Sequence, residues 1–159
     1  MSKWMLGLNF VSALGSGLIA GVFFAFSAFV MVSLARIPSE KGITAMQSIN
    51  ATILNTLFSI VFMGTALFTV LLGIGSFLKL GAPGTYYVLT GSLLYFAGSF
   101  LVTIFFNVPL NDALAAVTPS SSEGARVWQN YLSRWTAWNH VRTIASLASM
   151  ACFILAVCN

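Results

Sequence analysis

Charged side chains are scarce in this sequence. The 159 residues include seven Lys and Arg and three Asp and Glu, so that 6% of the chain is charged, whereas soluble domains average about 25%. Hydrophobic residues make up 58%, and the mean hydropathy is +0.94. This composition excludes a soluble domain with a polar surface, a disordered chain and a disulfide scaffold. The medium that suits most of these side chains is a lipid bilayer.

Residues that bind metals or form disulfides are also few, since the chain has one His and two Cys. Cys152 and Cys158 would lie on different faces and at different heights of one helix, too far apart to bond. His140 alone cannot form a multi-His zinc site, and no Cys pair has metal-binding spacing. We therefore expect no metal site. Haem is kept as an alternative because one axial His is sufficient to hold it.

Four segments dominated by apolar residues follow one another along the chain. They cover about 4–35, 42–78, 84–115 and 136–158. A membrane-spanning helix needs ~20 such residues, the first run is too long for a signal peptide, and the alternation of a β-barrel is absent. The sequence predicts an all-α, four-helix transmembrane bundle that forms a single domain, 1–159. Its second and third helices should extend well beyond the hydrocarbon layer.

An amphipathic segment, about 123–135, precedes the fourth span. Trp128, Tyr131, Leu132 and Trp135 fall at i, i+3, i+4 and i+7, with polar residues on the remaining faces. The pattern predicts a short helix in the loop between the third and fourth spans. Such a helix either lies at the membrane interface or caps the end of the bundle, and a simple aromatic belt is the alternative.

Basic residues divide unequally between the two ends of the expected bundle. One side has Lys3 and Lys79, and the other has Arg36, Lys41, Arg126, Arg134 and Arg142. The positive-inside rule places the second side, with both longer loops, in the cytoplasm. We therefore expect an integral protein of a bacterial inner membrane. The net charge of +4 is then explained by the orientation of the protein in the membrane and does not indicate a nucleic-acid partner.

Polar side chains inside membrane segments are costly, so their positions are the most informative about function. In an up-down-up-down bundle, the start of the second helix, the end of the third and the start of the fourth lie on the same side. The residues that meet there are Asn50, Asn55, Asn107, Asn111, Trp135, Asn139, His140 and Arg142. We expect one interior pocket that holds His140 with Asn50 or Asn55 and with Asn107 or Asn111. The alternative is that these residues only join helices, since such bonds contribute about 0.6 kcal/mol each.

Two local patterns concern helix geometry at this end. Trp135, Asn139 and Arg142 share one helical face, and His140 projects from the adjacent sector. Pro109 lacks the amide that would bond to the Phe105 carbonyl, so this carbonyl needs another partner or the helix needs a kink.

Small residues mark the first helix. Gly17 and Gly21 form a G-x-x-x-G pattern with Gly15 nearby, which lets this helix approach a neighbour closely. The neighbour is either within the bundle or in a second subunit, so a homo-oligomer is one possible assembly.

Four motifs spread over nearly the whole chain point to a known family. They are Phe23-Phe24-Ala25-Phe26 with Met31, Ala45-Met46-Gln47-Ser48-Ile49-Asn50, Asn107-x-Pro109-x-Asn111-Asp112, and Arg134-Trp135-x-x-Trp138-Asn139-His140-x-Arg142-Thr143. Together they resemble the DUF1772 family of anthrone oxygenase-like membrane proteins. The resemblance implies oxidation of an anthrone to an anthraquinone by O₂ without a known metal or flavin. It carries over to Asn107, Asn111, Trp135, Asn139, His140 and Arg142.

The implied chemistry is compatible with these residues. Loss of a proton turns an anthrone into an electron-rich anion that can pass an electron to O₂. Histidine exchanges protons near neutral pH, and a positioned base contributes ~10²–10⁴-fold in rate. We assign His140 as the base and Arg142 as the group that stabilises the anion. The substrate pocket would be completed by the asparagines and Trp135.

Three functions stay open at this stage. The first is a cofactor-independent oxygenase that acts on a hydrophobic anthrone-like or phenolic compound. The second is a non-enzymatic membrane protein that binds a lipid or a small aromatic ligand, or assembles with partners. The third is a haem protein that uses His140. We expect a hydrophobic small molecule and membrane lipid as partners, and no nucleic acid.

Overall fold

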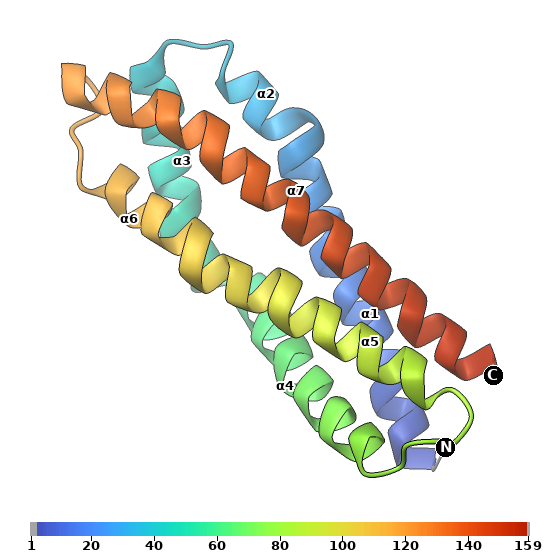
Figure 1. The fold of residues 1–159 in the computed structure, drawn as a ribbon. Coiled ribbons are helices and arrows are strands. Elements are labelled where there is room, and N and C mark those ends of the chain that lie inside the picture. The colour runs from blue at the N-terminus through green and yellow to red at the C-terminus, as the bar shows by residue number, and fades with distance from the viewer. Residues whose placement is uncertain (1–2, 159) are drawn as a thin grey trace.

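Helices make up all the regular structure in residues 3–158, which are the residues that the computed structural model describes. They form four long columns packed side by side (Figure 1). Four segments are long and apolar enough to cross a membrane: Lys3–Leu34, Leu57–Phe77, Thr85–Ala115 and Ser122–Cys158. The prediction of an all-α bundle with four membrane spans is therefore confirmed.

Two columns consist of several helical pieces. The first joins α1, Lys3–Ala25, through the π-helical turn η1, Phe26–Val30, to α2, Met31–Leu34. The third joins α5, Thr85–Tyr95, through the π-turns η2, Phe96–Leu101, and η3, Thr103–Asn107, to α6, Val108–Ala115. The other helices are α3, Ser39–Ile53, α4, Leu57–Phe77, and α7, Ser122–Cys158.

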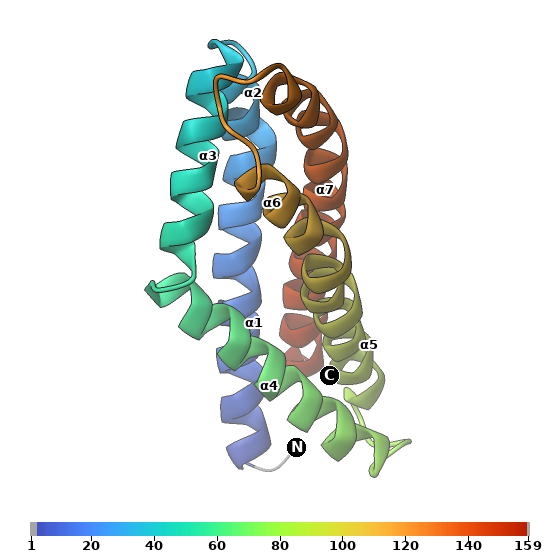
Figure 2. The same cartoon turned by 90° about the vertical axis from the view of Figure 1, so that its left-hand side faces the viewer.

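The two ends of the bundle differ in what they contain. The start of α1 and the end of α7 lie at the same end of the bundle, which we call the terminal end (Figure 1). The opposite end, which we call the loop end, contains α2, α3, α6 and the first part of α7 (Figure 2). Figure 2 shows α3 along the loop half and α4 crossing the terminal half at an angle to it.

The predicted single helix over 42–78 is wrong, because the chain breaks between α3 and α4. Thr56 is extended at φ −118° and ψ 171°, which ends the helical hydrogen-bond ladder. The hydroxyls of Thr56 and Ser59 both donate to the Ile53 carbonyl at 2.8 Å, so this helix end is satisfied by side chains. With 21 residues, α4 is about 32 Å long and matches the hydrocarbon layer without exceeding it. The third column, with 31 residues, does exceed it as predicted.

The predicted short helix over 123–135 is helical but not separate, since it continues directly into the fourth span as α7. Ser121 begins this helix, because its hydroxyl accepts the Gly124 amide at 2.9 Å in an N-cap. No Gly or Pro follows within α7 after Gly124. The aromatic face is buried against α2, α3 and α6, in a cluster of Met31, Ile43, Met46, Leu114, Trp128, Tyr131 and Trp135. The segment therefore caps the loop end, one of the two predicted locations.

Small residues bring the membrane-spanning helices close together. A Cβ added to Gly15 of α1 would meet the Thr65 hydroxyl of α4, and one added to Gly98 of η2 would lie 2.6 Å from the Ala145 Cβ. Gly17 packs against Met150 of α7, whereas a Cβ at Gly21 would meet nothing within 4 Å. Helix 1 thus uses Gly15 and Gly17 within the bundle, and Gly21 faces open space.

We expect Gly15→Ala to lower stability by about 1–3 kcal/mol, because the added methyl group overpacks the contact with Thr65. Gly21→Ala on the same helix is the matched control. It should leave stability unchanged or raise it slightly, since Ala has the higher helix propensity and the space is open. Equilibrium unfolding in mixed micelles measures both. Equal effects of the two substitutions would contradict the packing derived for α1.

Candidate functional site

Arg142 lies inside the bundle near the start of the apolar part of α7, and its residue is only 4% exposed. Its Nη2 donates to Asn139 Oδ1 at 2.7 Å and its Nη1 donates to Thr103 Oγ1 at 3.1 Å. The guanidinium lies 4.1 Å from the Phe23 ring centroid and 5.1 Å from that of Trp135. Its Nε has no hydrogen-bond partner. Polar and aromatic contacts therefore surround this cation, and its Nε donor is left unused.

No carboxylate of residues 3–158 forms an ion pair with Arg142. Within residues 3–158 the sole ion pair joins Glu123 to Arg126 at 3.2 Å, on the surface. The other two acidic residues, Glu40 and Asp112, are exposed. A guanidinium keeps its charge in proteins, and a buried cation in a membrane segment costs about 2.5–3.5 kcal/mol on insertion scales. Uncompensated positive charge is thus the strongest electrostatic feature of the interior.

Asn139 holds Arg142 in place through its whole amide group. Its Nδ2 donates to the Phe23 carbonyl and to Ser27 Oγ, both at 2.7 Å, while its Oδ1 accepts from Arg142. Phe23 lies in the last turn of α1, three residues before η1 begins. The acceptors that orient Asn139 therefore come from the first column, at the junction of α1 and η1.

The third column is also irregular beside Arg142. Thr103, the first residue of η3, accepts the hydrogen bond from Arg142 Nη1. Thr103 in turn donates to the Ser99 carbonyl at 2.8 Å. Asn107, fully buried, donates to the Trp135 carbonyl at 3.2 Å and so links η3 to α7. The π-turn η3 ends at Asn107, two residues before Pro109.

Tyr131 joins the other two asparagines and was not among the predicted site residues. Its hydroxyl donates to Asn111 Oδ1 at 2.8 Å and accepts from Asn50 Nδ2 at 3.4 Å. Its ring stacks on Trp135 with a centroid distance of 5.6 Å. The signal available in the sequence was its position four residues before Trp135, on the same helical face.

A pocket of about 170 Å³ lies next to these groups. Its polar lining is provided by Asn50, Ser59, Thr103, Asn111, Trp135 and Arg142, and the aromatic lining by Phe23, Phe26, Phe58, Phe62 and Phe100. Trp135 Nε1 and Arg142 Nε are buried donors without partners, and both residues line the pocket. The pocket thus places a positive charge in an aromatic enclosure, and two buried donors without partners belong to residues of its lining.

The structure brings most of the predicted site residues together. Asn50, Asn111, Trp135 and Arg142 line the pocket, and Asn139 and Asn107 are buried beside it through their bonds to Arg142 and to the Trp135 carbonyl. These residues come from all of the predicted helix ends.

Two predicted residues lie elsewhere, and the prediction that His140 is inside the bundle is wrong. His140 is exposed on α7 and does not line the pocket. Successive residues on a helix are about 100° apart around its axis. When Asn139 and Arg142 point into the bundle, His140 therefore points out of it. Asn55 is exposed in the break between α3 and α4 and does not line the pocket either.

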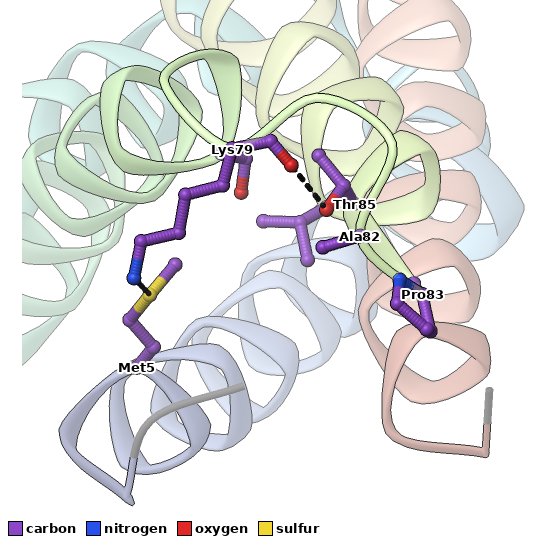
Figure 3. A pocket seen from close by; sticks show the side chains of 8 residues that line it. Met5, Lys79, Ala82, Pro83 and Thr85 are labelled. Atoms are coloured by element: carbon purple, nitrogen blue, oxygen red, sulfur yellow. Dashed lines mark hydrogen bonds between the residues drawn. The ribbon is translucent and has the colours of Figure 1, made fainter.

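A second pocket, of about 150 Å³, lies at the terminal end (Figure 3). Lys79 Nζ lies 4.0 Å from Met5 Sδ, and Thr85 Oγ1 donates to the Lys79 carbonyl at 3.3 Å. None of the predicted site residues lines this pocket. Its one cation is on an exposed residue, so it lacks the buried, uncompensated charge of the first pocket.

Comparison with known proteins identifies the family. The family model described as anthrone oxygenase matches residues 54–152, which is more than half of the chain, and the chain therefore belongs to this family. The match begins at the α3–α4 break and includes α4, the third column and most of α7, with Asn107, Asn111, Trp135, Asn139 and Arg142. No curated protein and no solved structure matches the chain.

We expect Asn139→Ala to lower the free energy of unfolding by about 3 kcal/mol, because it strips a buried cation of its best acceptor and the Phe23 carbonyl of its donor. In an Arg142→Met background the same substitution should cost less, by a coupling of about 1–2 kcal/mol. Equilibrium unfolding of the four proteins in mixed micelles gives this coupling. Additive effects would mean that Asn139 does not support the cation.

Proposed function

We propose that the protein is a membrane oxygenase that binds a flat, hydrophobic molecule with an acidic proton and stabilises its anion beside Arg142. The observation that carries this proposal is the buried guanidinium that lacks a carboxylate partner and has an unused Nε donor. A bound oxyanion would supply the missing negative charge. A good donor to such an oxyanion is worth ~10²–10³ in rate. Membership of the anthrone oxygenase family supports an anthrone-like substrate.

The aromatic lining supports a flat substrate. Phe23, Phe58, Phe62 and Phe100 line the pocket, and Phe58 and Phe62 stack with a centroid distance of 5.7 Å. Aromatic rings favour offset and edge contacts with other rings. These side chains therefore suit the rings of an anthrone, whereas a flexible acyl chain would gain less from them.

The reaction needs no group that the pocket lacks, provided that the substrate gives up its proton to water. The anthrone anion passes one electron to O₂, and the resulting carbon radical and superoxide combine to a peroxide anion, which takes a proton back from water to become a hydroperoxide. Loss of water from the hydroperoxide gives the quinone, so that one anthrone and one O₂ become one anthraquinone and one water. Arg142 favours the initial loss of the proton because it stabilises the anion that this loss forms. His140 has no part in this sequence of steps, since it does not line the pocket.

A second candidate function is binding without turnover. It is favoured by the absence of a base, because none of the described residues that line the pocket is Asp, Glu or His. In this case the protein would hold or carry the anionic form of a membrane-dissolved compound. The haem alternative lacks comparable support, since the sole histidine does not line either of the pockets described above.

We propose that the loop end faces the cytoplasm. Arg142 is buried in the bundle and does not count toward the charge of a loop. The exposed basic residues at the loop end are Arg36, Lys41, Arg126 and Arg134, against Lys3 and Lys79 at the terminal end. The positive-inside rule supports the same orientation as before with this corrected set.

We expect protein in lipid vesicles to consume O₂ with 1,8-dihydroxyanthrone above the rate in empty vesicles. Arg142→Met should lower this excess rate by about 10²-fold, because the anion loses its only charged partner. The matched control is Arg134→Met, which removes an exposed arginine from the same helix and should keep the full rate. His140→Ala should also keep it. An oxygen electrode measures all four rates.

Two outcomes separate the candidates. Ligand binding without O₂ consumption would favour the second function over the first. Loss of activity in His140→Ala with unchanged stability would contradict the mechanism and return the role of base to His140.

A further inference from the structure

The pocket beside Arg142 is open on one side, and apolar residues form its rim. Leu54 and Met63 on the α3–α4 side are 72% and 57% exposed, and Ile104 and Val108 on the η3–α6 side are 40% and 39% exposed. All four belong to the lining of the pocket. At the other extreme Arg142 and Trp135 are 4% and 5% exposed. The pocket therefore runs from a polar, buried interior to an apolar, exposed opening between α4 and η3.

The opening faces the hydrocarbon layer near one of its surfaces. Of the two helices on this side, α4 is a membrane span and α3 is not. Met63 lies six residues into α4, or about 9 Å along its axis. An exposed methionine at that depth in a span only as long as the hydrocarbon layer contacts lipid. A molecule dissolved in the bilayer can reach the opening without crossing water.

The volume of the pocket limits what it can enclose. An enclosed apolar cavity of about 150 Å³ is large enough to bind benzene. The pocket measures about 170 Å³, so it accommodates about one ring with its oxygen substituent. A molecule of three fused rings must therefore extend through the opening. The apolar rim provided by Leu54, Met63, Ile104 and Val108 suits the part that remains outside.

We propose that the pocket is loaded sideways from the bilayer: a flat, membrane-dissolved acid slides between α4 and η3 with its acidic oxygen first, and its far ring stays between Met63 and Ile104. This inference rests on the proposed function for the nature of the ligand, but it concerns the route and not the turnover. The oxygen moves toward Arg142, where its charge is compensated, and the ring keeps its apolar surroundings throughout. No part of the path requires the ligand to enter water.

Association can be followed without turnover, using 1,8-dihydroxyanthraquinone as the probe under nitrogen. The visible absorption of hydroxyanthraquinones shifts to longer wavelength on ionisation, so pairing with Arg142 changes the colour. Vesicles that contain the protein are mixed in a stopped-flow instrument with vesicles that contain the probe. We expect Met63→Trp to slow association by about tenfold, because the indole fills the opening while the interior of the pocket stays intact.

The matched control is Leu67→Trp, one turn further along α4 and also 57% exposed, but absent from the pocket lining. It should associate at the wild-type rate. Ile104→Trp obstructs the opening from the opposite side and replaces Met63→Trp if that variant does not fold. A shallow groove on the other side of α3, which includes Thr52, is the competing route, and Thr52→Trp obstructs it.

Each outcome supports or overturns the proposal. Slow association in Met63→Trp or Ile104→Trp, with normal rates in Leu67→Trp and Thr52→Trp, supports the lateral route. Wild-type rates in both obstructed variants overturn it, as does slow association in Thr52→Trp alone. Probe binding by this route with no O₂ consumption from an anthrone would sink the proposed oxygenase and leave the route standing. Wild-type association rates in both obstructed variants, together with O₂ consumption from an anthrone, would do the reverse.

Discussion

The bundle is organised around one charge that the membrane interior does not favour. Arg142 is buried, no acidic residue compensates it, and it is held by Asn139, by Thr103 and by the faces of Phe23 and Trp135. Cation–π contacts in desolvated sites are worth about 2 kcal/mol, which is of the same order as the cost of a cation in a membrane helix. The resting protein can therefore tolerate the charge. A bound anion would still gain from it, because Nε is unused.

The location of the pocket follows from irregular helices at one level of the bundle. The first column has η1 there, the second is broken between α3 and α4, and the third consists of η2 and η3, while α7 continues as a regular α-helix. In each case a side chain bonds to a carbonyl beside the irregularity: Asn139 to that of Phe23, Ser59 to that of Ile53, and Thr103 to that of Ser99. Elsewhere small residues keep the helices close, as Gly15 of α1 does against Thr65 of α4. The bundle thus opens where its polar residues are concentrated.

The sequence was sufficient to predict the four membrane spans, because an apolar run of ~20 residues almost without charge is typical of a helix that crosses the hydrocarbon layer. It was also sufficient to place Asn50, Asn107, Asn111, Asn139 and Arg142 at the same end, since helix order decides which ends meet. The prediction from the sequence was wrong for His140, because it placed side chains from two different sectors of the fourth helix in the same interior pocket. Arg142 lies two residues after His140, which is about 160° around the axis, so the two side chains cannot both point inward. Trp135, Asn139 and Arg142 lie on one face of the helix, and His140 is not on that face.

The break after α3 was harder to predict, because a run without charge resembles one helix whether or not it is continuous. The signal was the local density of hydroxyl and amide groups in 50–59, which compete with the backbone for its hydrogen bonds. This break also has a structural consequence that composition cannot reveal. It lets α4 leave the direction of α3 (Figure 2). Met63 of α4 and Ile104 of η3 both line the pocket. The polar residues that end α3 thus allow the break beside which the pocket of Arg142 opens toward lipid.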